Sequence, residues 1–157
     1  MTSAQNTAGE AQDPAEIIDR CYELISFAAQ SEPDWPNFRA LFAEKAVLAL
    51  RVFPGDPAIS VMTLDEYCIR QMREGLKETG YAETALDRNI RVFGDVAVAT
   101  VDFQMHFGNE PPVPAIDVFL LARRGGRWLI VSIIGEVTKG PGADPIAEPR
   151  SKSKRDN

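Results

Sequence analysis

Residues 115–136 read AIDVFLLARRGGRWLIVSIIGE and predict the two strands of one hairpin. Gly125 and Gly126 stand at its centre, and such a pair is typical of a sharp reversal in which the backbone adopts positive φ. Both arms are rich in branched and aromatic apolar residues, so we expect them to be buried. One carboxylate, Asp117, lies near the start of the first arm, where a buried strand normally carries an apolar side chain.

The segment before this hairpin predicts two more long strands. One runs from about Ala82 to Phe93 and meets a tight turn at Gly94-Asp95, and the next runs from Val96 to Phe107 with clear alternation. Its apolar face carries Ala97, Ala99, Val101, Phe103, Met105 and Phe107. Its more polar face carries Val98, Thr100, Asp102, Gln104 and His106. This alternation predicts an antiparallel sheet with one face against a core.

Two helices are predicted near the start of the chain. Asp13 is a capping residue followed by Pro14, which favours a helix start, and the helical spacing of apolar residues continues to near Gln30. The sequence SEPDWP then predicts a loop. Asp34 is expected to cap a short second helix, which would bury Trp35, Phe38, Leu41 and Phe42.

A strand and a third helix complete the first half of the chain. The sequence AVLALRVF predicts a strand over Ala46–Phe53, which the prolines and glycine of PGDP end. Thr63 and Glu66 have the spacing of a capping box and predict a helix that runs to about Gly80. Its buried face would carry Leu64, Tyr67, Cys68, Met72 and Leu76.

Helices followed by a run of long antiparallel strands predict an α+β fold. Because three helices cannot surround so long a sheet, we expect a cone-shaped half-barrel, in which the sheet curves and about three helices close its concave side. The space between helices and sheet is a common place for a small ligand.

Composition and charge restrict the function. The chain has 157 residues, 17 basic and 23 acidic, so its net charge of −6 argues against nucleic-acid and anionic-membrane partners. No run approaches the length of a membrane span, no leader is visible, and we expect a cytoplasmic protein. The expected domain spans residues 13–139, between disordered segments 1–12 and 140–157. The widely separated Cys21, Cys68 and His106 predict no metal site, and we expect no cofactor.

The chain resembles the nuclear transport factor 2-like superfamily over about residues 14–139. The likeness rests on the first helix, the segment WPNFRALFAEKAVL, the capped helix before the strands, and the closing hairpin with its glycine turn. The resemblance implies the half-barrel. It leaves the function open, because proteins of this fold include isomerases, dehydratases, polyketide cyclases, SnoaL-like proteins, small-molecule binders and interaction domains.

Ketosteroid isomerases are similar at one further stretch, Ile-Asp-x-Phe, which here begins at Ile116. That resemblance implies that Asp117 is a protonated acid in an apolar pocket, beside a tyrosine of the first helix that Tyr22 would match. The family's general base, however, aligns with Leu50, which cannot accept a proton. Alternation along the strand should turn the neighbouring Arg51 to the opposite face. We therefore expect no ketosteroid isomerase activity.

The leading hypothesis is a single-domain protein that binds a hydrophobic small molecule in an apolar pocket. The candidate ligand-binding residues are Tyr22, Trp35, Tyr67, Phe103, Met105, Asp117, Phe119 and Ile133. One alternative is an isomerase, dehydratase or cyclase acting on a hydrophobic cyclic or polyketide-like substrate. Asp117 would be its catalytic acid, and the base is unlocated, with Asp19, Glu23, Glu66 and Glu83 conceivable.

Another alternative is a non-catalytic dimerisation or interaction module. For the small-molecule binder we expect a homodimer through the outer face of the sheet. That face would carry Thr100, Asp102, Gln104 and His106, with apolar neighbours Ile116, Val118 and Leu120. His106 then points away from the pocket.

Overall fold

The computed structural model describes residues 13–72 and 74–140. In this part of the chain the helices are α1 (Pro14–Ile25), α2 (Trp35–Arg39), α3 (Leu64–Gln71) and α4 (Leu76–Thr79). The strands are β1 (Phe42–Leu50), β2 (Ser60–Thr63), β3 (Tyr81–Phe93), β4 (Val96–Phe107), β5 (Val113–Arg124) and β6 (Arg127–Val137). The terminal segments predicted to be disordered lie outside the described residues, except for Gly140.

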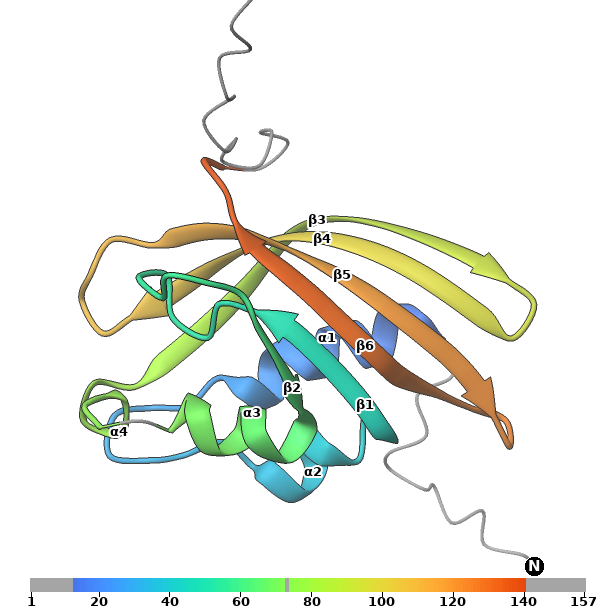
Figure 1. The fold of residues 1–157 in the computed structure, drawn as a ribbon, viewed down its shortest axis with the longest axis horizontal. Coiled ribbons are helices and arrows are strands. Elements are labelled where there is room, and N and C mark those ends of the chain that lie inside the picture. The colour runs from blue at the N-terminus through green and yellow to red at the C-terminus, as the bar shows by residue number, and fades with distance from the viewer. Residues whose placement is uncertain (1–12, 73, 141–157) are drawn as a thin grey trace, which may run out of the picture.

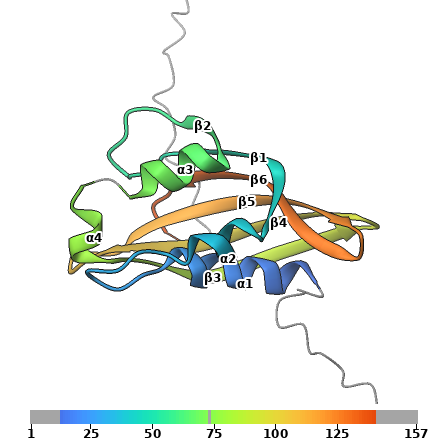
Figure 2. The ribbon, with the colours of Figure 1, turned by 90° about the horizontal axis from the view of Figure 1, so that it is seen from below.

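The strands form one curved, open sheet in the order β2-β1-β6-β5-β4-β3. Figure 1 shows the long strands β3 to β6 arching over the helices, which lie on one side of the sheet. In the view from below, α1 lies along β3 and α3 lies beside β1 and β2, in agreement with the contacts between these elements (Figure 2). The predicted α+β half-barrel is therefore confirmed.

The sheet is mixed rather than wholly antiparallel, because β1 pairs with β6 in parallel. The predicted hairpin over residues 115–136 is formed by β5 and β6, and its turn residues Gly125 and Gly126 have the expected positive φ of 55° and 76°. The alternation predicted for β4 is also confirmed. Its inward side chains from Ala97 to Met105 are all buried against the helices.

The first half of the chain differs from the prediction at several boundaries. Helix α1 ends at Ile25 rather than near Gln30, because Phe27 pairs with Tyr81 of β3 through two backbone hydrogen bonds. Strand β1 begins at Phe42, which was expected in a helix, and it ends at Leu50. The short strand β2, which pairs with β1, was not predicted.

The single helix predicted from Thr63 to Gly80 is two helices, α3 and α4. Thr63 caps α3 as expected, since its side chain accepts a hydrogen bond from the Glu66 amide. Gly75 then has a φ of 93°, which a right-handed helix cannot contain. Gly80 ends α4 at a place where an added Cβ would lie 2.8 Å from the Ala29 backbone nitrogen. The break lets α3 cover β1 and β2 while α4 leads back to β3.

Candidate functional site

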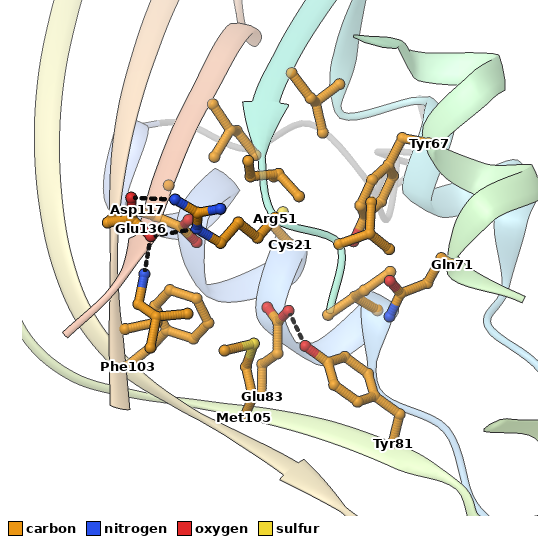
Figure 3. Close-up of a pocket in the computed structure, with 18 of the residues that line it drawn as sticks. Cys21, Arg51, Tyr67, Gln71, Tyr81, Glu83, Phe103, Met105, Asp117 and Glu136 are labelled. Atoms are coloured by element: carbon orange, nitrogen blue, oxygen red, sulfur yellow. Dashed lines mark hydrogen bonds and ion pairs between the residues drawn. The ribbon is translucent and has the colours of Figure 1, made fainter. Parts of the chain in front are cut away.

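A pocket lies between the concave face of the sheet and the helices (Figure 3). The empty space of the pocket, including the solvent at its open mouth, has a volume of about 610 Å³. The part of this space that the centre of a water molecule can reach has a volume of about 50 Å³. Its apolar wall is formed mainly by Ile25, Phe38, Leu48, Phe103, Met105 and Ile133. Its polar groups are Arg51, Tyr67, Gln71, Tyr81, Glu83, Asp117 and Glu136.

Asp117 is buried in this pocket, with only 7% of its surface exposed. The hydroxyl group of Tyr22 on α1 donates a hydrogen bond to Asp117 Oδ2 at 2.9 Å. Burial raises the pKa of Asp117 well above its usual value, and nearby Glu83 raises it further, whereas the Tyr22 hydrogen bond lowers it. The expectation that Asp117 faces the cavity beside Tyr22 agrees with this arrangement.

Gly135 makes room for this carboxyl group. It lies opposite Asp117 in the β5–β6 register, and a Cβ added to it would lie 2.6 Å from Asp117 Oδ1. Any side chain at position 135 would therefore displace the carboxyl group or the strand. The glycine in the sequence IIGE thus has a structural reason that the sequence alone did not reveal.

Glu83 is a second carboxyl group in the same pocket. The Tyr81 hydroxyl group donates a hydrogen bond to Glu83 Oε1 at 2.6 Å, and the Glu83 backbone amide donates one to Ser26 Oγ at 3.0 Å. Burial raises the pKa of Glu83 to about 7, although the Tyr81 hydrogen bond opposes this. Glu83 was one of four conceivable bases from the sequence. Of these four, the described pocket is lined by Glu83 alone.

Arg51 and Glu136 form an ion pair, and both residues line the pocket. Arg51 Nε donates a hydrogen bond to Glu136 Oε1 at 3.0 Å, and Arg51 Nη1 donates one to the Asp56 carbonyl oxygen at 3.0 Å. The expectation that Arg51 points away from the pocket is wrong, because β1 ends at Leu50 and strand alternation does not extend to the next residue. Leu50 itself lines the pocket, so the position aligned with the isomerase base is apolar.

The structure brings together most of the predicted ligand-binding residues. Tyr67, Phe103, Met105, Asp117 and Ile133 line the pocket, and Tyr22 reaches it through Asp117. Two other predicted residues do not line it. Phe119 is fully buried and contacts the Tyr22 ring edge-to-face, with ring centres 5.9 Å apart. Trp35 packs edge-to-face on Phe38 at 5.5 Å, outside the cavity.

Sequence reasoning missed several polar or reactive side chains in the pocket. Cys21 is a buried free thiol that lines it, and burial raises its pKa. Gln71 lies one helical turn after Tyr67 on α3, so the helical period could have placed it on the same face. Arg51 and Glu136 carried no such signal, because both depend on the ends of β1 and β6.

The sequence also led us to expect no metal site and no membrane span, and it placed His106 away from the pocket. Among the described residues, no group of three or more His, Cys, Asp or Glu side chains could hold a metal ion. In the same part of the chain, no helix has the length and apolar character of a membrane span. His106 lies on the outer face, where its Nε2 is 3.2 Å from Thr84 Oγ1.

A family model described as "Putative lumazine-binding" matches residues 25–134 of the chain. The match covers most of the sheet and helices α2 to α4. A search of curated proteins found no match.

Solved structures with the same fold are numerous. A nuclear transport factor 2-like protein with a cystatin-like fold from Novosphingobium aromaticivorans is 19% identical with a TM-score of 0.60, covering 81% of this chain and 80% of its own. A structure described as a putative ketosteroid isomerase from Shewanella frigidimarina is 19% identical with a TM-score of 0.50, covering 66% and 81%. The association domain of CaMKII from C. elegans is 16% identical with a TM-score of 0.59, covering 79% and 92%. At these identities the similarity shows the nuclear transport factor 2-like fold alone.

Proposed function

Because this chain belongs to the family described as putative lumazine-binding, we propose that it binds a small molecule in the pocket between α1, α3 and the sheet. The observation that carries the proposal is the pocket itself, which is walled by apolar side chains and holds a few buried polar groups. This is the usual composition of a ligand site. Lumazine, the compound in the family's description, is a flat two-ring heterocycle and belongs to the size class that we propose.

The size and charge of the pocket restrict the ligand. The pocket is open at its mouth, and the small volume of about 50 Å³ that water centres can reach favours a ligand of one or two rings. Burial disfavours negative charge in this pocket, as the raised pKa values of Asp117 and Glu83 show, so an anionic ligand would bind poorly. The Arg51 guanidinium group is bonded to Glu136 and Asp56. We therefore expect a neutral, mostly apolar ring compound.

Native mass spectrometry of protein purified from its own cells tests this function. We expect a bound small molecule that is released on denaturation. Ala115→Leu should abolish the bound mass, since Ala115 lines the pocket and the larger side chain would fill it. Ala122→Leu on the same strand is the matched control, because Ala122 lies outside the pocket and the variant should keep the ligand. Retention of the bound mass by Ala115→Leu would contradict the proposed site.

A second candidate function is proton transfer on a ring ketone, favoured by Glu83 in the pocket that Asp117 also lines. Glu83 would accept a proton from the carbon next to the carbonyl group, and neutral Asp117, held by Tyr22, would donate a hydrogen bond to the carbonyl oxygen. A pKa of about 7 suits Glu83 for this role. Protein-dependent exchange of the α-deuterons of 2-tetralone, lost in Glu83→Gln, would support it. Exchange at the uncatalysed rate would reject it.

We also propose that the outer face of the sheet joins two copies of the chain. Apolar side chains are exposed there on three neighbouring strands: Val98 is 38% exposed, Leu120 38% and Ile134 47%. The strand registers place Val98 opposite Leu120, and Val118 between Thr100 and Ile134. Burying such a continuous apolar surface would stabilise a dimer. A pure interaction module would use this face without the pocket.

A further inference from the structure

We propose that Gln71 and Tyr67 form a hydrogen-bonding edge that recognises a cyclic amide, or lactam, in the ligand. The inference rests on the small-molecule binding proposed above and adds the chemical class of the ligand. It follows from two polar groups on α3 that line the pocket and make no hydrogen bond with the described part of the chain.

The Gln71 amide is the first of these groups. Only 2% of the residue is exposed, and its side chain lines the pocket (Figure 3). Among the residues that the structure describes, none makes a hydrogen bond with its side-chain amide. In the described part of the chain, every fully buried side-chain nitrogen or oxygen atom has a hydrogen-bond partner, so the unpaired Gln71 amide must reach the open space of the pocket. A ligand bound there could therefore pair with the amide.

Tyr67 supplies the second group from the preceding turn of the same helix. Residues four apart lie on one face of a helix, and both side chains line the same cavity. The Tyr67 ring is stacked on Phe38 with 6.1 Å between ring centres, which fixes its direction. Its hydroxyl group also lacks a hydrogen-bond partner in the described part of the chain. The two side chains therefore present a donor and acceptor set from one wall.

The chemistry of this set favours a lactam. A glutamine amide offers one acceptor and a donor side by side, and it pairs with a ligand edge that carries N–H next to C=O. The Tyr67 hydroxyl group can add a third bond. A carboxylic acid would be ionised in water, and burial in the pocket would disfavour its negative charge. A neutral lactam ring satisfies the amide while its carbon skeleton packs on Phe103, Met105 and the rest of the apolar wall.

Three two-ring probes separate this inference from the proposed function. Naphthalene has the shape and no polar edge, quinolin-2(1H)-one has a lactam edge, and its N-methyl derivative keeps the carbonyl group but loses the N–H donor. Dissociation constants are measured by NMR titration of the full chain. For the wild-type protein we expect all three to bind, with quinolin-2(1H)-one about 10-fold tighter than its N-methyl derivative, in line with the loss of one hydrogen bond.

Two variants and a control test the residues. Gln71→Met keeps the length of the side chain without its amide, and it should weaken quinolin-2(1H)-one about 10-fold while leaving naphthalene within about 2-fold. Tyr67→Phe should weaken the lactam by a smaller factor. Gln30→Met makes the same exchange at an exposed position outside the pocket and should change neither constant. Melting temperatures confirm that each variant is folded.

The outcomes are distinguishable. If neither naphthalene nor quinolin-2(1H)-one binds the wild-type protein, the proposed function fails and the inference fails with it. If naphthalene binds but the lactam is no tighter than its N-methyl derivative, the inference is overturned while the proposed function stands. The same conclusion follows if Gln71→Met weakens naphthalene and the lactam equally. The comparison of ligands on the wild-type protein holds even if a variant does not fold.

Discussion

The hydroxyl group of Tyr22 on α1 lies 2.9 Å from Asp117 Oδ2 on β5 and donates a hydrogen bond to it. These residues are 95 positions apart, and both are buried. The bond joins the first helix to the centre of the sheet at the floor of the pocket. It is also the polar pair that the resemblance to ketosteroid isomerases implied.

Tyr22→Phe should lower the free energy of unfolding by about 1–3 kcal/mol, because it leaves the buried Asp117 carboxyl group without this donor. Urea unfolding measures the change. A double-mutant cycle with Asp117→Ala isolates the pair, and we expect a coupling energy clearly different from zero. Purely additive losses would show that the bond does not stabilise the fold.

The stability of the protein should fall as pH rises from about 4.5 to 7. Burial raises the folded pKa of Glu83 from 4.5 to about 7. The folded state therefore holds a proton that the unfolded state releases within this window, and stability decreases as pH increases. Burial of Asp117 acts in the same direction.

Glu83→Gln isolates this contribution, since the amide oxygen can still accept from Tyr81. The drop in unfolding free energy between pH 4.5 and 7 should be smaller in the variant by about 1–2 kcal/mol, a value reduced because Glu83 is only half-buried. Chemical unfolding at each pH measures it. An identical pH profile in both proteins would contradict the assigned pKa.

Gly135→Ala should destabilise the protein and disturb the site. The added Cβ would lie 2.6 Å from Asp117 Oδ1, and the Tyr22 hydrogen bond hinders retreat of that carboxyl group. Overpacking of this kind costs about 1–3 kcal/mol. Thermal unfolding checks the prediction, with Gly55→Ala as the control, because a Cβ at Gly55 meets no atom within 4 Å. Equal melting temperatures for the two variants would count against the close contact.

Leu120→Lys should convert the proposed dimer to a monomer. The residue is 38% exposed at the centre of the outer face, and a charge there would oppose burial against a second copy. Sedimentation velocity at micromolar concentration measures the state. Ile69→Lys is the control, because Ile69 is 75% exposed on α3, away from that face. A monomeric wild-type protein would reject the proposed interface.

The sequence predicted the sheet better than the first half of the chain. Alternation in β4 and the glycine turn of β5–β6 are local signals, and both were read correctly. The end of α1 was predicted incorrectly, because it depends on the pairing of Phe27 with Tyr81, and these residues are far apart in the chain. Strand β2 likewise exists through its pairing with β1.

The residues of the site could be predicted where the alternation along a regular strand shows which side of the sheet a side chain occupies. Phe103, Met105 and Asp117 belong to the inward faces of regular strands, and all three line the pocket. Arg51 was misplaced because it follows the last residue of β1. Gln71 follows Tyr67 by one helical turn, but it was overlooked because a glutamine side chain is usually exposed.

The central claim, a small-molecule pocket under the curved sheet, is tested most directly by the methyl resonance of Met105. Met105 lines the pocket, whereas Met62 is buried outside it and serves as the internal reference. With ¹³C-methyl methionine and increasing naphthalene, the account predicts a saturable ring-current shift of the Met105 signal and a constant Met62 signal. An unchanged Met105 signal at saturating naphthalene, or equal shifts of both signals, would contradict it.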